Sequence, residues 1–160
     1  GGETPKQFLE ISGVPVIIRT LERFEACPDV NEIVLVLSAE DIEYFQSLRA
    51  RFDLKKLTKI VSGGATRARS VANGLKAIDA VRTEIVAVHD GARPLVSVDD
   101  ISRTIAEARA SGAACLVAPV TDTIKEVAGG RIAQTIDRMR LRRALTPQCF
   151  RSDILRRAFD

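Results

Sequence analysis

Aromatic residues are scarce in this chain. Phe, Tyr and Trp together make up 4% of its 160 residues, and Trp is absent. Proteins that bind single-stranded nucleic acid stack bases on aromatic side chains, so this composition argues against that class. The 24 basic and 21 acidic residues give a formal net charge of +3. Such a small excess does not indicate a nucleic-acid partner and fits small anionic substrates better.

Cysteines and long apolar runs are also few. Cys27, Cys115 and Cys149 are far apart in the sequence and lack clustered histidines. They indicate neither a disulfide framework nor a zinc site, so we expect reduced, mostly buried thiols. No apolar run approaches the roughly 18 residues of a membrane span, and no signal-peptide pattern is present. We therefore expect a cytoplasmic protein without a membrane partner.

What the chain does contain is an alternation of helical and strand patterns. Its apolar content of 46% over 160 residues suffices for one domain with a core. Helical spacing predicts helices at residues 15–26, 40–52, 66–80 and 98–110, and apolar runs predict strands at 32–38, 59–61, 84–88 and 113–120. The last two strands are expected to be buried. This order predicts an α/β fold with a mostly parallel sheet flanked by helices.

The pattern changes at about residue 121. Apolar segments at 124–127 and 132–136 flank Gly129-Gly130, a pair that tolerates positive φ, which predicts a hairpin. We expect an arm of about residues 121–139 that protrudes from the single domain. Both ends of the chain look truncated, because residues 1–6 begin in loop chemistry and residues 151–160 stop inside a helical pattern without a C-cap signal.

The most informative segment is Val-His-Asp-Gly-Ala-Arg-Pro at residues 88–94. Asp90 directly follows a predicted strand, and ligands of α/β proteins bind at the carboxyl ends of strands. A carboxylate there can hold a divalent cation, and Pro94 fixes the turn that aims Arg93. An Asp-Gly turn with a surface ion pair is the competing interpretation. His89, the only histidine, is expected to pack within the strand, because no Ser or Cys partner is nearby in sequence.

Two segments near the start of the chain suit phosphate or base recognition. Lys6 follows a proline in a loop, where its ammonium could face a polyphosphate. A solvated surface lysine is the competing and commoner interpretation. Gly63-Gly64 precede a predicted helix whose first backbone amides could face an anion or a base edge. Thr66 as a plain N-cap, with Arg67 and Arg69 solvated, explains the second segment equally well.

Two further segments lie in the second half of the chain. Thr123 belongs to a polar loop after the predicted 113–120 strand, and a polar loop alone would account for it. Arg138 could bind a phosphate in bidentate fashion, and Thr146 could bond a hydroxyl or phosphate. The competing interpretation assigns Arg138 to a solvated basic cluster with Arg140, Arg142 and Arg143.

Five motifs occur in a fixed order. They are Pro-Lys-Gln, Ser-Gly-Gly-x-x-Arg-x-x-Ser-Val, Val-His-Asp-x-Ala-Arg-Pro, Pro-Val-x-Asp-Thr-Ile-Lys, and Asp-Arg followed by Leu-Thr-Pro-Gln. Together they closely resemble the 2-C-methyl-D-erythritol 4-phosphate cytidylyltransferases of the non-mevalonate isoprenoid pathway, from Pro5 to Phe150. The resemblance implies a Rossmann-like nucleotidyltransferase that joins CTP to a sugar-alcohol phosphate, with Mg²⁺ as cofactor and pyrophosphate as the second product.

The resemblance also implies roles for individual residues. The implied catalytic residues are Lys6, Asp90 and Arg138; the nucleotide-binding residues are Gly64, Ser70 and Asp90; the substrate-binding residues are Thr123, Arg138 and Thr146; and the metal ligand is Asp90. Arg93 is assigned to positioning. The arm implies a homodimer, in which Thr123 and Arg138 complete the pocket of the neighbouring subunit.

The chain departs from the family at both ends. The family's first strand and its Ala-Ala-Gly-x-Gly-x-Arg triphosphate loop are absent, with Gly1-Gly2 as the expected remnant of that loop. The C-terminal segment with a metal-binding acid and a second lysine is absent too, so we expect these 160 residues alone to be inactive. Three alternatives stay open: a pentitol phosphate cytidylyltransferase acting on ribitol 5-phosphate, a non-catalytic nucleotide-binding module, and one half of a fused bifunctional enzyme.

Overall fold

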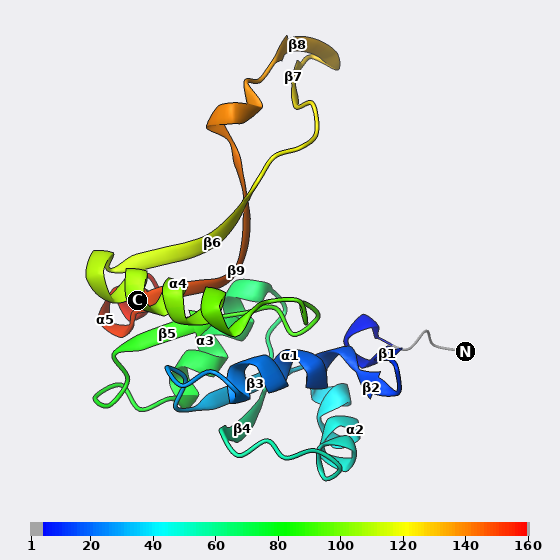
Figure 1. Cartoon of the computed structure of the whole chain (residues 1–160), viewed down its shortest axis with the longest axis vertical. Helices are drawn as coiled ribbons and strands as arrows, with labels where there is room; N and C mark the ends of the chain where they lie inside the picture. Colours follow the sequence, from blue (N-terminus) through cyan, green and yellow to red (C-terminus); the bar gives the residue numbers. More distant parts are fainter. Residues whose placement is uncertain (1–4, 160) are drawn as a thin grey trace.

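A computed structural model of the chain describes residues 5–159, so the expected loop remnant at Gly1-Gly2 lies outside the described part. The helices are η1 (Lys6–Phe8), α1 (Val16–Glu25), α2 (Ala39–Arg49), α3 (Arg67–Ala77), α4 (Val98–Ser111), η2 (Arg138–Arg140) and α5 (Ser152–Arg157) (Figure 1). The strands are β1 (Glu10–Ile11), β2 (Val14–Pro15), β3 (Ile33–Leu37), β4 (Leu57–Ser62), β5 (Ile85–Val88), β6 (Ala113–Pro119), β7 (Lys125–Ala128), β8 (Arg131–Thr135) and β9 (Arg142–Arg151). All the predicted helices and strands are present, although α2 and α3 end three residues earlier than expected.

The strands form separate groups. β3 and β4 pair in parallel, with Val34 opposite Lys59 and Leu37 opposite Ser62. β9 lies between β5 and β6 and runs antiparallel to both. β5 and β6 are consecutive in the chain, which would suggest that they are neighbours in the sheet. They do not pair with each other, because β9 lies between them.

The sequence did not predict β9. Its first residues are charged, and it contains Pro147, which cannot donate to a β-ladder. The structure resolves this conflict through an irregularity in the pairing. Register with β6 shifts between Cys115 and Val117, and Pro147 falls among the residues of β9 that have no partner there.

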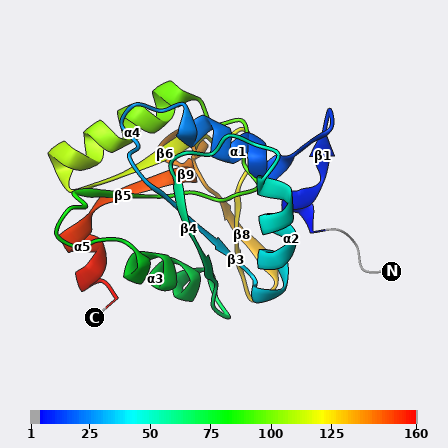
Figure 2. The same ribbon diagram turned by 90° about the horizontal axis from the view of Figure 1, so that it is seen from below.

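Helices cover both faces of the strands. Viewed from below, α1 and α4 lie on one side of β5, β6 and β9, while α3 and α5 lie on the other (Figure 2). Capping groups set the ends of α4: the Ser97 hydroxyl accepts a hydrogen bond from the Asp100 amide at 3.0 Å, and Gly112 ends the helix with φ at +94°. α5 ends at Arg157, so the helical pattern does not run on to the last described residues.

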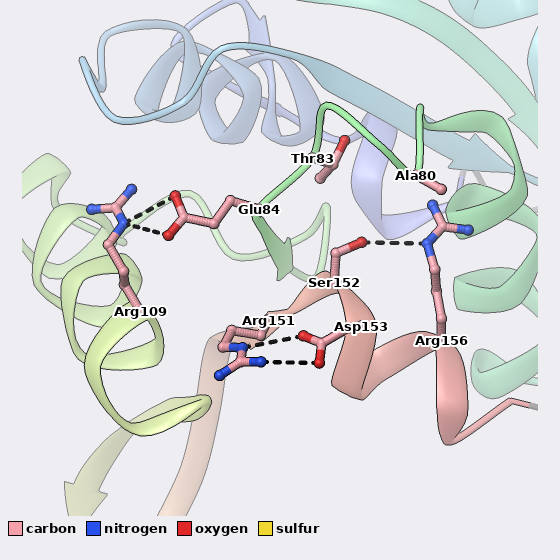
Figure 3. A pocket seen from close by; sticks show the side chains of 8 residues that line it. All are labelled: Ala80, Thr83, Glu84, Arg109, Arg151, Ser152, Asp153 and Arg156. Carbon is pink, nitrogen blue, oxygen red and sulfur yellow. Dashed lines mark hydrogen bonds and ion pairs between the residues drawn. The ribbon is translucent and has the colours of Figure 1, made fainter.

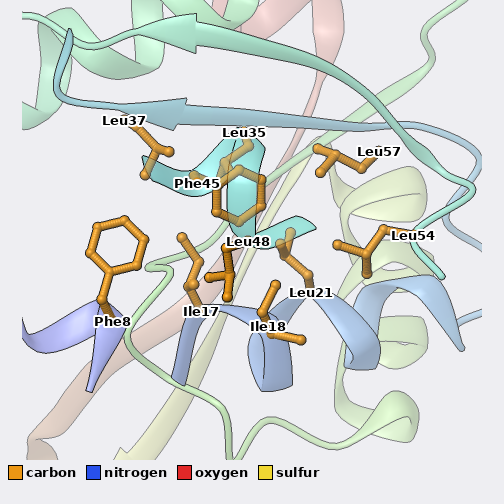
Figure 4. Packing of buried hydrophobic residues seen from close by; sticks show 10 residues of the cluster. All are labelled: Phe8, Ile17, Ile18, Leu21, Leu35, Leu37, Phe45, Leu48, Leu54 and Leu57. Carbon is orange, nitrogen blue, oxygen red and sulfur yellow. The ribbon is translucent and has the colours of Figure 1, made fainter. Parts of the chain in front are cut away.

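Two apolar clusters hold the layers together. In the first, α1 and α2 pack against β3 through side chains that converge between them (Figure 4). Ile18 and Phe45 are fully buried at its centre. The second cluster lies between α1, α4 and β9, around Ile101 and Cys149. Burial of these side chains contributes about 1.5–3 kcal/mol each for Ile and Phe, which fixes α1 with respect to both groups of strands.

A large cavity separates the two groups of strands. It has a volume of about 1660 Å³ and is lined along their length by β3 and β5, with apolar side chains of α1 and α3 closing its sides. In the described part of the chain, β4 is the only strand paired with β3, and β9 the only one paired with β5. The edges of β3 and β5 that face the cavity are therefore unpaired.

Two strands are less buried than predicted. All four residues of β5 are only partly covered, and β6 alternates between exposed and partly covered residues. The prediction of buried strands was wrong here for a geometric reason. β5 borders the cavity, and β6 forms the outer edge of its sheet, so neither strand is enclosed by neighbours on all sides.

The predicted arm is a β-hairpin. β7 and β8 pair antiparallel, and Gly129 and Gly130 make the turn with φ of +56° and +76°. Figure 1 shows the hairpin extending well away from the helices and the sheet. Its residues are exposed, including the apolar side chains of Val127 and Ile132. An isolated two-stranded hairpin has little stability in water.

The three cysteines are free thiols, as expected. Cys27 and Cys149 are buried, whereas Cys115 is exposed on β6. Burial raises the pKa of the Cys149 thiol to about 12, so this group stays protonated and unreactive near neutral pH. In residues 5–159, no helix is both long and apolar enough to cross a bilayer.

One buried hydroxyl joins α1 to the loop that follows β5. Thr20 is 3% exposed, and its Oγ1 lies 2.8 Å from the Gly91 carbonyl oxygen and 3.0 Å from the Val16 carbonyl oxygen. Because Val16 is in the same helix, the contact with Gly91 is the one that links two elements. It holds the backbone of the loop against the helix.

We expect Thr20→Val in the full-length protein to lower the free energy of unfolding by about 1–3 kcal/mol, because it leaves the Gly91 carbonyl without its donor. Thr104→Val is the matched control, since Thr104 is 7% exposed and its hydroxyl bonds only the Asp100 carbonyl of its own helix at 2.6 Å. Urea unfolding of both variants measures the difference. Equal losses would show that the contact with Gly91 adds nothing to stability.

Candidate functional site

The site begins where β5 ends. Asp90 follows the strand after His89, and its carboxylate accepts hydrogen bonds from two guanidinium groups. Nε of Arg93 lies 2.8 Å from Oδ2, and Nε of Arg67 lies 3.3 Å from Oδ1. Each oxygen of the carboxylate is thus held by a different arginine, and the arginines come from different segments of the chain.

The two ion pairs determine the charge state of Asp90. Partial burial alone would raise the pKa of this carboxyl group, but the hydrogen bond from Arg93 and the positive charge of Arg67 outweigh that effect and lower the pKa below 3.8. The side chains are 35–54% exposed, and such exposed pairs contribute only about 0–1 kcal/mol to stability. Their main consequence is to orient an ionised carboxylate.

The loop from Asp90 to Arg93 is fixed by its own backbone and by His89. The Arg93 amide donates to the Asp90 carbonyl at 3.1 Å, and Nε2 of His89 lies 3.1 Å from the Arg93 carbonyl oxygen. The His89 ring packs against Phe24, with 4.8 Å between ring centroids. Burial lowers the pKa of His89 below 6.5 despite the nearby Arg93 carbonyl and Asp90 charge. The prediction that His89 packs is confirmed, but the residue lies just after β5 and not within the strand, and it is only partly buried.

The glycine loop before α3 is closed by a hydroxyl. The Gly64 amide donates to Oγ of Ser70 at 3.1 Å, and the Ser70 hydroxyl donates to the Thr66 carbonyl at 3.1 Å. A side chain at position 64 would collide with Cβ of Arg69, so the loop needs glycine there. Thr66 caps α3, since its Oγ1 accepts from the Arg69 amide at 3.1 Å, which confirms the N-cap interpretation. This capping role does not exclude a binding role for Gly64 and Ser70.

Thr146 lies beside Asp90 although the two are far apart in sequence. It is 6% exposed, and its Oγ1 accepts a weak hydrogen bond of 3.4 Å from the Asp90 amide. The contact arises because β9 pairs with β5 up to Val88 and Gln148. Thr146 therefore sits just past the end of β5, next to the loop that carries Asp90.

The structure brings most of the predicted site residues together. Lys6, Ser70 and Asp90 line the same cavity between β3 and β5, and Gly64 and Thr146 bond directly to two of them. Arg93 and Arg67 line the cavity as well. Two arginines pair with Asp90, and Lys6 adds a third positive charge to the lining of the same cavity. This part of the cavity, the rim of the site, is therefore a favourable place for an anionic ligand.

Two predicted residues lie elsewhere. Thr123 precedes β7 and is exposed, and Arg138 is exposed at the base of the arm, where its Nη1 donates to the Thr121 carbonyl at 2.7 Å. Neither lines the cavity between β3 and β5. Within one copy of the chain, the structure therefore does not unite these two residues with Lys6, Ser70 and Asp90.

Sequence reasoning missed two residues of the site. Arg67 was quoted within a motif but given no role, and one of the two open interpretations left it solvated. In the structure its Nη2 donates to Oε1 of Gln148 at 3.2 Å while its Nε pairs with Asp90. The separations in sequence are 23 and 81 residues, so no local pattern could have revealed these contacts. Gln148 was quoted only as the last residue of a motif.

Within residues 5–159, the site offers a divalent cation few protein ligands. In the part of the chain that the structure describes, no group of three or more His, Cys, Asp or Glu side chains could hold a metal. Mg²⁺ nonetheless often binds through one or two carboxylates, with substrate phosphates and water completing its coordination. Asp90 lines the cavity and is ionised, so it could be such a carboxylate ligand.

A second, smaller cavity lies at the opposite end of β5. Its volume is about 460 Å³. Figure 3 shows that two of its arginines, Arg109 and Arg151, face acidic partners, whereas Arg156 faces the Ser152 hydroxyl. Nε of Arg109 lies 3.1 Å from Glu84, and Nη2 of Arg151 lies 3.0 Å from Asp153. None of the predicted site residues lines this cavity, so it is not the site that the motifs indicated.

Comparison with known proteins adds an independent line of evidence. The family model described as IspD, 2-C-methyl-D-erythritol 4-phosphate cytidylyltransferase, matches residues 1–160. A relative of that name from Bacillus velezensis is 43% identical over 153 residues, covering 96% of this chain and 65% of the relative. One from Symbiobacterium thermophilum is 44% identical over 160 residues, covering 99% of this chain and 66% of the relative. A protein named bifunctional enzyme IspD/IspF from Bradyrhizobium diazoefficiens is 46% identical over 156 residues, covering 97% of this chain and 38% of that protein.

Solved structures agree. The 4-diphosphocytidyl-2C-methyl-D-erythritol synthase from Anaerococcus prevotii superimposes with a TM-score of 0.83 at 27% identity, covering 94% of this chain and 67% of that one. The 2-C-methyl-D-erythritol 4-phosphate cytidylyltransferase from Thermus thermophilus superimposes with a TM-score of 0.73 at 34% identity, covering 97% and 69%. These likenesses confirm the α/β, Rossmann-like nucleotidyltransferase fold. The chain spans about 65% of the length of the Bacillus velezensis relative, and with a family model matched along all 160 residues, it belongs to the 2-C-methyl-D-erythritol 4-phosphate cytidylyltransferase (IspD) family.

Proposed function

We propose that the whole protein transfers CMP from CTP to 2-C-methyl-D-erythritol 4-phosphate, in isoprenoid precursor synthesis. A phosphate oxygen of the acceptor attacks the α-phosphorus of CTP, the bond from that phosphorus to the bridging oxygen breaks, and pyrophosphate leaves with the electron pair. The observation that carries the proposal is the shared cavity of Lys6, Ser70 and Asp90. A cationic rim beside an ionised carboxylate suits a triphosphate and its metal.

Each group at the rim has a task in this reaction. Lys6 would stabilise the negative charge that grows on the phosphates as the bond breaks. Gly64 and Ser70 would present an amide and a hydroxyl to the edge of the cytosine. Asp90 would hold Mg²⁺ near the ribose and the phosphates, and Thr146 would bond the acceptor. When bound, Mg²⁺ would neutralise charge on the phosphate oxygens.

The unpaired edges of β3 and β5 support a further part of this proposal. The resemblance implies one more strand, followed by a glycine-rich loop with an arginine, that residues 1–160 do not include. We propose that this strand fills the cavity between β3 and β5. Both neighbouring edges are free in the described residues, and the lining side chains include Leu35 and Val86. The loop after that strand would then reach the rim beside Lys6.

The arm supports a homodimer. Thr123 and Arg138 lie away from the cavity of their own chain, and the hairpin exposes apolar side chains. We propose that the arm packs on a second copy, where Thr123 and Arg138 bind the acceptor phosphate in the neighbour's site. The free thiols suit a reducing compartment, and we propose that the protein acts in the cytoplasm.

Turnover of alternative acceptors tests the proposed reaction. The full-length protein, CTP and Mg²⁺ would be incubated with 2-C-methyl-D-erythritol 4-phosphate or with ribitol 5-phosphate, and pyrophosphate release would be measured. We expect release with the first acceptor and at most slow release with the second. A preference for ribitol 5-phosphate would make the protein a pentitol phosphate cytidylyltransferase, and CTP binding without any release would make it a non-catalytic module. Residues 1–160 alone should show no turnover.

Arg138 provides a quantitative prediction. Arg138→Ala should lower kcat/KM for the acceptor about 10- to 100-fold, because charge-assisted hydrogen bonds contribute about 1.5–3 kcal/mol. The affinity for CTP, measured by calorimetry, should stay within about twofold. Arg140→Ala is the matched control, since it removes the same charge from the same 3-10 helix. If Arg140→Ala is as damaging, the effect is one of general charge rather than of phosphate binding.

Mixed dimers separate a contribution across subunits from one within a subunit. Lys6→Ala removes a charged side chain from the cavity, whereas Arg138→Ala removes one from the arm. If the arm serves the neighbour, a dimer that combines one subunit of each variant has one site with both residues intact. We expect the mixture to recover activity that neither variant shows alone. No recovery, despite confirmed subunit exchange, would place Arg138 in the site of its own chain.

A further inference from the structure

Arg67 occupies an unusual place between the parts of the site. It is the first residue of α3, directly after the glycine loop that Ser70 closes. From there its guanidinium reaches Oδ1 of Asp90 at 3.3 Å and Oε1 of Gln148 at 3.2 Å. One side chain thus joins α3, the end of β5 and the middle strand β9.

The two anchors of Arg67 differ in what they fix. Gln148 pairs with Val88 in the ladder between β9 and β5, so the sheet holds its position firmly. The bond to Gln148 fixes the plane of the guanidinium, and Nε then points at the carboxylate of Asp90. Because the guanidinium group is planar, it holds both contacts in one fixed geometry, which an ammonium group cannot do.

The other arginine paired with Asp90 cannot fix the carboxylate relative to a different element of the fold. Arg93 belongs to the loop that carries Asp90, and its amide bonds the Asp90 carbonyl. It therefore moves together with the carboxylate that it holds. Among the charged side chains paired with Asp90 in residues 5–159, Arg67 is the one that comes from a different element.

We propose that Arg67 is a positioning residue that sets the direction of the Asp90 carboxylate from the nucleotide side of the site. The inference rests on the proposed function and assigns a new part of it. The glycine loop is tied to the start of α3, because the Gly64 amide donates to the Ser70 hydroxyl and the Thr66 side chain caps the helix. A base bound at that loop would hold α3 in place, and Arg67 would pass this constraint to Asp90. Arg67 itself acts through Asp90 and not on the reacting atoms.

The test uses the full-length protein with CTP, 2-C-methyl-D-erythritol 4-phosphate and Mg²⁺. Arg67→Lys keeps the charge but loses the planar guanidinium, so we expect kcat/KM for the acceptor to fall about tenfold. We expect a similar loss for Arg67→Gln. The dissociation constant of CTP without acceptor should change less than about threefold, and the unfolding temperature should stay close to that of the wild type. Gln148→Ala should produce a smaller loss of the same kind, because it removes only the anchor of the guanidinium.

Arg69→Gln is the matched control, since it removes a positive charge from the same turn of α3. Arg69 is exposed and its side chain has no ion pair in the described structure. We expect kinetics like those of the wild type. If Arg69→Gln is as damaging as Arg67→Gln, the effect comes from general charge and the proposal is overturned.

The double variant Arg67→Lys/Asp90→Asn distinguishes positioning from independent action. If Arg67 acts through Asp90, the double variant should be no slower than Asp90→Asn alone. Losses that multiply would overturn the proposal, as would wild-type kinetics for Arg67→Lys. Should the Arg67 variants fail to fold, wild-type kinetics for Gln148→Ala would overturn it as well. Absence of turnover in the wild-type protein itself would refute the proposed function and this inference together, whereas an active wild type with an unaffected Arg67→Lys refutes the inference alone.

Discussion

The pairing of Asp90 with two guanidinium groups is the contact on which the rim of the site depends. A carboxylate that is partly buried would lose some of its acidity, yet Arg93 and Arg67 keep it ionised and point its oxygens in fixed directions. Ion pairs this exposed add little to stability. The bond from Thr20 to Gly91 and the ring of His89 hold the loop beneath them. These contacts hold the Asp90 carboxylate in a defined position.

The cavity that these residues line separates two groups of strands. β3 with β4, and β5 with β9 and β6, present unpaired edges to one elongated cavity. Helix α1 spans them by packing into both apolar clusters. Among the described residues, no strand lies between β3 and β5, and Thr123 and Arg138 belong to a projecting arm. Both features agree with the proposals that a further strand fills the cavity and that a second copy completes the site.

Much of the fold follows from local sequence patterns. Helical spacing located α1 to α4, apolar runs located β3 to β6, and the paired glycines located the hairpin. β9 escaped prediction because Pro147 and a run of arginines contradict strand propensity, and only the pairing irregularity opposite β6 accommodates them. The burial of β5 and β6 was overestimated, because it depends on packing against distant parts of the chain, which the sequence of one strand does not reveal.

The site shows the same division between local and long-range information. Motif order singled out Lys6, Ser70, Asp90 and Thr146. In the structure the first three line one cavity, and Thr146 lies beside Asp90. The roles of Arg67 and Gln148 could not be foreseen, because their contacts join residues up to 81 positions apart. Thr123 and Arg138 do not line the cavity of their own chain, and their predicted role in substrate binding stays a prediction.

A crystal structure of the full-length protein with CTP and Mg²⁺ is the most direct measurement. We expect the triphosphate beside Lys6, the metal on Asp90, and the cytosine against Gly64 and Ser70. Nucleotide bound at a different place, such as the cavity between Arg109 and Arg156, would contradict the assignment of the rim as the site of CMP transfer.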